Sequence, residues 1–117
     1  MKDWYTRTVF FVRDAQTSLE FYQQQLDCTL DWSHTENGRA FVCQVSRPGF
    51  ELILAQDETK AGRGRAFVSL DESQTQALRA AVSAKGLRAT DGWWGMPIIE
   101  ILDPDKNELF FSPPAAP

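Results

Sequence analysis

The segment from Trp93 to Phe111 restricts the fold of this chain more than any other part of its sequence. Its centre, Ile98–Leu102, is rich in β-branched residues, which favour buried strands. The following Asp103–Asn107 has turn chemistry, because proline fixes φ and because aspartate and asparagine cap their own backbone or tolerate positive φ. A second, mostly apolar run, Glu108–Phe111, follows the turn and would form the returning strand. The segment therefore predicts two strands joined by a tight turn.

The first part of the chain predicts one strand, one helix and three more strands. Apolar residues lie on both faces of Trp4–Arg13, which indicates a largely buried strand that ends before Asp14. Thr17–Glu20 has the spacing of a capping box, so we expect a helix to begin there and to run to about Leu26. Three further strands, separated by turn sequences, are expected at Thr29–Thr35, Arg39–Ser46 and Phe50–Gln56.

The same order of elements restarts about 57 positions later. A strand at Arg65–Leu70 is followed by Asp71, as Asp14 follows the first strand, and then by a helix at Ser73–Ala84. Short strand material at Leu87–Thr90 leads into the hairpin. A βαβββ unit is thus expected twice. We expect a single domain over residues 1–117, with a first module at about 1–57, a flexible linker at about 57–64 and a second module at about 65–113.

Composition excludes several classes of protein. The chain has 117 residues and a formal net charge of −4, which argues against binding to nucleic acid. No apolar run approaches the roughly 20 residues that a bilayer span needs, and the first residues lack the apolar core of a signal peptide. We therefore expect a cytoplasmic protein that makes no membrane contact. Cys28 and Cys43 are expected to be buried free thiols, and the single His34 excludes a site that needs two histidines from one chain.

Two stretches of the sequence resemble the vicinal oxygen chelate superfamily, which holds glyoxalase I, ring-cleaving dioxygenases and bleomycin-resistance proteins. One is the hairpin with its Trp94-Gly95-Met96 lead-in and Asp-Pro-Asp turn, and the other is the first strand with its helix. The resemblance covers essentially the whole chain. It implies an α+β fold in which two βαβββ modules form a U-shaped mixed sheet around a cavity, within one chain or between the partners of a homodimer. Lys106 stands where the family usually has glycine, so either Asn107 takes the strained conformation or the turn type differs.

The resemblance also shows where the enzymes of this superfamily hold a divalent metal. They use four side chains, usually His, Gln or Glu, and the matching positions here are Arg7, Glu51, Arg65 and Phe110. Arginine stays protonated and only donates hydrogen bonds, and phenylalanine has no donor atom for a metal, so Glu51 alone could ligate. Glu108 could add a second carboxylate if the strand register slipped by two. We therefore expect no metal, no other cofactor and no catalytic residue, and the chain leans away from being an enzyme.

Because side chains alternate along a strand, one set of strand residues is expected to face the cavity and the other set to pack under the helices. The set expected under the helices contains Phe10, Val12, Leu52, Leu54, Val68, Leu70, Ile99, Ile101, Leu109 and Phe111. Together with the aromatic residues near the mouth of the cleft, the expected ligand-binding residues are Arg7, Phe11, Trp32, Glu51, Arg65, Phe67, Trp93, Trp94, Glu100 and Phe110. One hypothesis is that Arg7 and Arg65 pair with Glu51 and Glu100 in the space of a metal. The alternative is that both arginines reach the rim and meet solvent.

Four functions follow from these observations. The first is a metal-independent small-molecule binding protein resembling bleomycin-resistance proteins, which as a homodimer sequesters an aromatic or cationic compound such as an antibiotic. The second is a metal-dependent lyase, isomerase or dioxygenase of the same superfamily. The third is a metal-free enzyme with Glu51 or Glu100 as general base. The fourth is a structural or regulatory dimer with a filled cavity.

Overall fold

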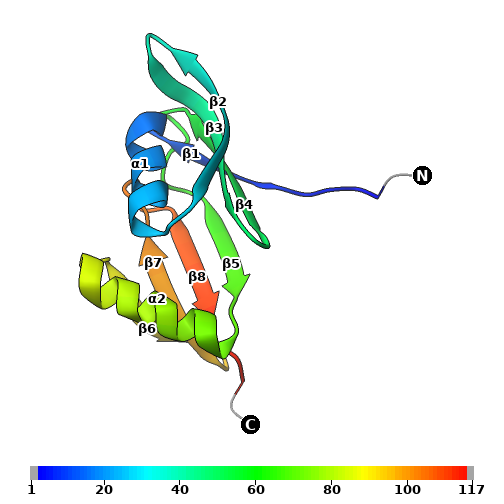
Figure 1. The fold of residues 1–117 in the computed structure, drawn as a ribbon, viewed down its shortest axis with the longest axis vertical. Coiled ribbons are helices and arrows are strands. Elements are labelled where there is room, and N and C mark those ends of the chain that lie inside the picture. Colours follow the sequence, from blue (N-terminus) through cyan, green and yellow to red (C-terminus); the bar gives the residue numbers. More distant parts are fainter. Residues whose placement is uncertain (1–2, 116–117) are drawn as a thin grey trace.

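The computed structural model describes residues 3–115, which form an α+β fold of two successive modules (Figure 1). The first module contains β1 (Thr8–Val12), α1 (Ala15–Gln25), β2 (Thr29–Glu36), β3 (Arg39–Arg47) and β4 (Phe50–Gln56). The second contains β5 (Arg65–Ser69), α2 (Glu72–Lys85), β6 (Ala89–Trp93), β7 (Pro97–Leu102) and β8 (Glu108–Ser112). Within the described residues, neither helix has the length and apolar character needed to cross a bilayer.

Each module has its own four-stranded mixed sheet. The strand orders are β1-β4-β3-β2 and β5-β8-β7-β6, with the first pair of each sheet parallel and the other pairs antiparallel. The predicted repeat is confirmed, because β1 and β5 begin and end at positions that differ by the expected offset of about 57. The two predicted βαβββ units are therefore present.

Both helices begin directly after an aspartate that caps them, and the first does not begin at its predicted capping box. The side chain of Asp14 accepts hydrogen bonds from the backbone N–H groups of Gln16 and Thr17, so α1 begins three residues earlier than the Thr17–Glu20 spacing suggests. Asp71 caps α2 in the same way and forms a capping box with Gln74. The expected start at Thr17 is thus wrong, because a residue that ends a strand in extended geometry is already placed to cap the next helix.

The core lies between the helices and one face of each sheet, as strand alternation predicts. Every residue of the parity expected under the helices is either buried in the core or packed against it. The two helices differ in how deeply they pack: α1 buries Ala15, Ser18, Leu19 and Tyr22, whereas α2 has no buried residue. The first strand is also shorter than expected, since Trp4 and the residues up to Arg7 are exposed and lie outside the sheet.

The turn between β7 and β8 joins the second module to the first. Asp103 Oδ1 accepts hydrogen bonds of 2.9 Å from the backbone N–H groups of Asp105 and Asn107. The Asn107 amide in turn donates to the carbonyl of Phe11 on β1 at 3.2 Å and accepts from Gly64 N at 2.7 Å. Lys106, and not Asn107, takes the left-handed conformation, with φ of 70°. Asn107 is instead held in place by its side-chain hydrogen bonds.

Candidate functional site

The sheet faces that the helices leave uncovered are the open faces of the two modules. Alternation along the strands places Val9 and Phe11 of β1 on one of them, and Phe67 of β5 and Phe110 of β8 on the other. Large apolar groups there are accessible, with exposed fractions of 44% for Val9 and 46% for Phe67. Accessible apolar residues gathered on one surface mark a place where a ligand or another protein surface binds.

Three rings form an aromatic cluster on the open face of the second module. The ring centroids of Phe67 and Trp94 are 5.9 Å apart with planes 25° apart, and those of Trp94 and Phe110 are 4.5 Å apart and tilted by 45°. Trp94 lies in the turn between β6 and β7, where its backbone N–H donates to the carbonyl of Met96 at 3.0 Å. Gly95 has φ of 77°, a conformation that suits glycine, and it lets this turn fold the indole back over the sheet.

Charged groups lie beside the aromatic cluster. Arg65 Nε donates to Glu108 Oε1 at 2.9 Å, because these residues face each other in the β5–β8 register. The Glu100 carboxyl hydrogen-bonds to Glu108, and partial burial together with that neighbour raises the pKa of Glu100. The hydrogen bond from Arg65 lowers the pKa of Glu108. A proton between the two carboxyls therefore resides mainly on Glu100, and once Glu100 ionises this side carries two negative charges against one positive charge.

The open face of the first module is more polar. Arg7 Nη1 donates to Gln44 Oε1 at 2.8 Å, and the Gln44 amide donates to Asp31 Oδ2 at 2.8 Å. The Arg7 guanidinium lies 5.4 Å from the centroid of the Tyr5 ring, and Lys60 Nζ lies 5.0 Å from that of Phe11. Gln44 was missed by the sequence reasoning, although the alternation of β3 could have placed it on this face.

The hypothesis that Arg7 and Arg65 pair with Glu51 and Glu100 is wrong for this chain. Among residues 3–115, neither guanidinium forms an ion pair with either of those carboxylates. Arg65 does bind a carboxylate, but it is Glu108, which lies directly across in the register. Arg7 instead donates a hydrogen bond to the side-chain amide of Gln44 on β3.

The predicted ligand-binding residues divide into two groups and an outlier. Arg65, Phe67, Trp94, Glu100 and Phe110 come together on the second module, and Glu108 joins them. Arg7, Phe11, Trp32 and Glu51 belong to β2, β4 and the β1 region of the first module, where Trp32 pairs with Gln44 across the β2–β3 ladder. Trp93 ends β6, is 71% exposed and lies outside the aromatic cluster. Within residues 3–115 no side-chain hydrogen bond or ion pair joins the first group to the second.

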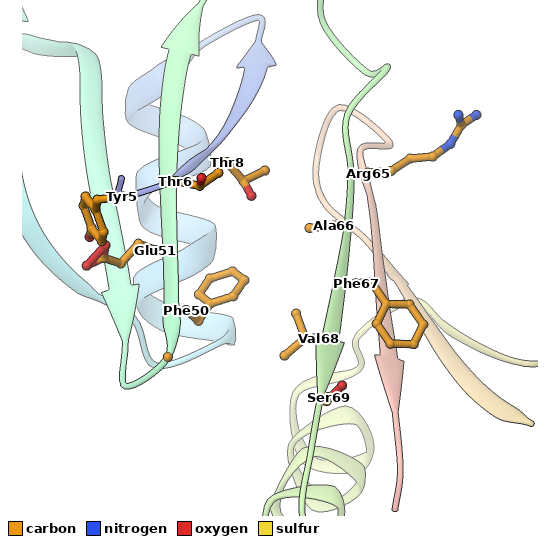
Figure 2. Close-up of a pocket in the computed structure, with 11 residues that line it drawn as sticks. Tyr5, Thr6, Thr8, Phe50, Glu51, Arg65, Ala66, Phe67, Val68 and Ser69 are labelled. Atoms are coloured by element: carbon orange, nitrogen blue, oxygen red, sulfur yellow. The ribbon is translucent and has the colours of Figure 1, made fainter. Parts of the chain in front are cut away.

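A cleft of about 710 Å³ separates β4 from β5, and its lining includes Glu51, Arg65 and Phe67. Figure 2 shows that Phe50 and Val68 point toward each other across the gap, whereas Arg65 and Phe67 point to the other side of β5. The lining therefore includes residues from both sides of β5, the edge strand of the second sheet. The aromatic cluster and its carboxylates lie on the side of the second module's sheet that is opposite Val68.

The four positions that hold a metal in related enzymes do not fit one here. Arg65 is a cation engaged with Glu108, Arg7 is a cation engaged with Gln44, and Phe110 is part of the aromatic cluster. Among residues 3–115, no three His, Cys, Asp or Glu side chains are grouped closely enough to hold a metal ion. A zinc site in an enzyme has at least three protein ligands, whereas Glu51 is the one ligating side chain at these four positions.

Comparison with solved structures shows the fold of this chain in other proteins. A glyoxalase/bleomycin resistance protein from Catenulispora acidiphila is 18% identical with a TM-score of 0.78, over 97% of this chain and 100% of that one. A lactoylglutathione lyase from Agrobacterium tumefaciens is 13% identical with a TM-score of 0.74, over 96% and 94%. TnmS3, an antibiotic binding protein from a Streptomyces species, is 18% identical with a TM-score of 0.69, over 98% and 100%.

These identities are low enough that the likeness concerns the fold alone. None of the curated protein sequences compared with this chain matches it. A sequence model of one family, however, matches residues 4–111. That match spans both βαβββ modules and the hairpin with which they end. The chain therefore belongs to the Glyoxalase/Bleomycin resistance protein/Dioxygenase superfamily.

Proposed function

We propose that this chain is a metal-independent binding protein that, as a homodimer, sequesters a planar cationic compound such as an antibiotic. The observation that carries the proposal is the aromatic cluster of Phe67, Trp94 and Phe110 with Glu100 and Glu108 beside it. Arg65, the basic group that lies beside the cluster, is already paired with Glu108. Among residues 3–115 Glu100 forms no ion pair, so once it is ionised it is the carboxyl on this face that can serve as counter-ion to a ligand.

The chemistry of the cluster favours a cation over a neutral or anionic ligand. The faces of aromatic rings carry negative electrostatic potential, so a flat cation stacked on them is stabilised by about 0.5–2 kcal/mol. The negative charge of ionised Glu100, which lies close by, also favours a cation. A planar ligand also fits the nearly parallel rings of Phe67 and Trp94, whose planes differ by 25°. The antibiotic-binding character of TnmS3, which has the same fold, is consistent with this use of the open face.

The shape of the chain supports a homodimer in which the open faces are covered. Its principal extents are 50 × 43 × 24 Å and its radius of gyration is 14.7 Å, whereas a compact chain of this length has a radius near 13 Å. The accessible surface is 7639 Å², against about 6,500 Å² for a compact monomer of this mass. The excess is comparable to the roughly 800 Å² that each partner contributes to a standard interface.

A fluorescence titration tests the proposal. Trp94 stacks in the cluster, so binding of N-methylacridinium, a planar permanent cation, should quench tryptophan emission in a saturable way. Neutral acridine at pH 8 should bind less tightly, and acridine-9-carboxylate should not bind. Phe110→Ala and Glu100→Gln should each weaken binding of the cation about tenfold or more, while Trp4→Phe, a change at a fully exposed residue, should leave it unchanged. Equal affinity for the cation and the anion would contradict the proposal.

Two further measurements test the remaining parts. Elemental analysis of protein purified without chelators should find no near-stoichiometric transition metal, and stoichiometric nickel, zinc, manganese or iron would favour the metal-dependent enzyme instead. Light scattering should give the mass of a dimer, and Phe67→Glu, which places a charge on the open face, should shift it toward the monomer. A wild-type monomer at micromolar concentration would refute the dimer.

A further inference from the structure

A second cavity lies on the helix side of the molecule, away from the open faces. It has a volume of about 390 Å³ and is bounded by the C-terminal end of α1, the β3–β4 turn, the end of β5 and α2. Phe50 and Val68, which line the β4–β5 cleft in Figure 2, also line this cavity, so the two spaces are neighbours. We refer to the cavity as the helix-side groove. Its volume lies in the range of small-molecule sites, about 300–1,000 Å³.

The groove exists because α2 packs loosely on its sheet. Leu78 and Val82 are only partly buried, and no residue of α2 is fully buried, in contrast to α1. The helix is held at its C-terminal end by Lys85, whose Nζ donates to Gln24 O at 2.8 Å and lies 3.4 Å from Asp27 Oδ1. Amphipathic helices gain most of their stability from packing their apolar face. An apolar ligand under α2 would add the contacts that the protein itself leaves unmade.

The lining of the groove is mainly apolar. Leu26, Cys28 and Phe111 are buried residues along it, and Leu70 and Leu78 are partly buried against the core. Burial raises the pKa of Cys28 to about 11, so its thiol is neutral near pH 7 and adds no charge. A ligand that fills this space must therefore present a hydrocarbon surface to most of the walls.

One charged group at one end of the groove keeps unused hydrogen-bonding capacity. Arg47 Nη1 donates to Leu26 O at 3.0 Å, but among residues 3–115 its guanidinium forms no ion pair. A guanidinium has five donors, so Arg47 keeps most of its capacity for an anion.

The charges around this end favour an anion. Asp27 is the acidic residue that lines the groove, and it is paired with Lys85. Arg47 is thus left as the uncompensated charge in a protein whose overall net charge is −4. Planar guanidinium binds carboxylates by two parallel hydrogen bonds, which are stronger than neutral ones.

We propose that the helix-side groove binds an amphipathic monocarboxylate of medium chain length. The carboxylate lies against Arg47, and the hydrocarbon tail lies under α2 among Leu70, Leu78 and Phe111. This site is separate from the proposed cation site, since it lies on the other side of the sheets and has the opposite charge preference.

Titration of the ¹⁵N-labelled full-length protein with octanoate, decanoate and decanol tests the proposal. Below micelle-forming concentrations, decanoate should bind most tightly and decanol least tightly. The amide signals of Leu78, Val68 and Leu70 should shift, while those of Trp94 and Glu100 should not. Absence of binding at millimolar concentration, or shifts confined to the open faces, would overturn the proposal. Because these measurements use the unmodified protein, they do not depend on the folding of a variant.

Matched variants locate the two ends of the ligand. Arg47→Gln should weaken binding of both carboxylates at least about tenfold and leave decanol unaffected. Ala77→Phe, a change at an exposed position that lines the groove, should abolish binding of all three ligands. Arg79→Gln, which removes an arginine of α2 paired with Asp91 outside the groove, should change nothing. Equal losses in Arg47→Gln and Arg79→Gln would show only a general effect of charge and would reject the assigned contact.

Discussion

The phenol of Tyr22, on α1 of the first module, donates a hydrogen bond of 3.1 Å to Asp103 Oδ2, in the β7–β8 turn of the second module. Both side chains are fully buried. Asp103 also receives the side-chain amide of Asn107 at 2.9 Å. Burial raises the pKa of Asp103, whereas the hydrogen bonds from Asn107 and Tyr22 oppose that rise. The contact therefore fixes how one module sits against the other, and so where each open face points.

Tyr22→Phe should lower the free energy of unfolding by about 1–3 kcal/mol, because it removes one of the two side-chain donors to the buried Asp103 Oδ2, which keeps only the amide of Asn107. The change removes a single oxygen and leaves no large cavity. Denaturant unfolding measures the effect. Tyr5→Phe removes the same atom from an exposed ring and should change stability by no more than about 0.5 kcal/mol. Equal effects in the two variants would contradict the role of the Tyr22–Asp103 hydrogen bond.

Gly64→Ala should destabilise the protein by several kcal/mol or prevent its folding. A Cβ at Gly64 would lie 2.4 Å from Phe10 Cδ1 and 2.9 Å from Asn107 Oδ1, at the contact between the modules. Its φ does not lie in the left-handed region, so the effect is steric. Gly92→Ala is the matched control, because the nearest atom there is 4.0 Å away. Thermal unfolding of both variants would check the difference, and a stable Gly64→Ala protein would disprove this contact.

Lys106→Gly should raise the free energy of unfolding by up to about 1 kcal/mol. The left-handed conformation costs a residue with a Cβ about 1–2 kcal/mol, and the greater flexibility of glycine in the unfolded chain offsets about 0.4–1 kcal/mol of the relief. Lys106→Ala removes the same long side chain but keeps the Cβ, so it should bring no comparable gain. If the alanine and glycine variants were equally stable, the strain at φ of 70° would not be the cause.

Stability should fall as the pH rises above about 9. Burial raises the pKa of Cys28 and Cys43 to about 11, from 9.0 for an exposed thiol. Between these values the unfolded chain has lost protons that the folded chain keeps, so the free energy of unfolding decreases with pH, by up to about 1.4 kcal/mol per pH unit for each such group. Buried Tyr22 acts in the same direction, because burial also raises its pKa.

Denaturant midpoints measured between pH 7 and 10.5 would show this loss of stability. Cys43→Ala leaves a small cavity, yet it should flatten the alkaline part of the profile relative to the unmodified protein. A profile with an unchanged slope would mean that this thiol ionises equally in the folded and unfolded states.

Affinity for a permanent cation should increase as the pH rises through the pKa of Glu100. That pKa is raised by partial burial and by the neighbouring Glu108, so Glu100 is neutral at a pH where an ordinary glutamate is ionised. Binding of N-methylacridinium favours the ionised form and should release a proton in this interval. Glu100→Gln should remove the dependence, and calorimetry in buffers of different ionisation enthalpy would detect the proton. A pH-independent affinity in the unmodified protein would exclude Glu100 as the counter-ion.

Local sequence rules were sufficient for the repeated architecture and for the face of each residue. Alternation assigned Phe10, Leu52 and Leu109 to the core, and it placed Phe67 and Phe110 on the uncovered side. The repeat located both βαβββ units, whereas the capping-box rule chose Thr17 for the first helix, which Asp14 in fact caps. The rules of alternation work because pleat and helix period depend on residues a few positions apart.

Only the tertiary structure decided which groups meet. Arg65 lies 43 positions from Glu108 in the chain and pairs with it because the parallel register puts them side by side. Nothing in the local pattern distinguishes that carboxylate from Glu51 or Glu100. The same holds for Tyr22 and Asp103, and for the loose packing of α2 that leaves the helix-side groove. Periodicity sets the direction of a side chain, whereas its partner depends on contacts between distant segments, which form only when the two modules pack together.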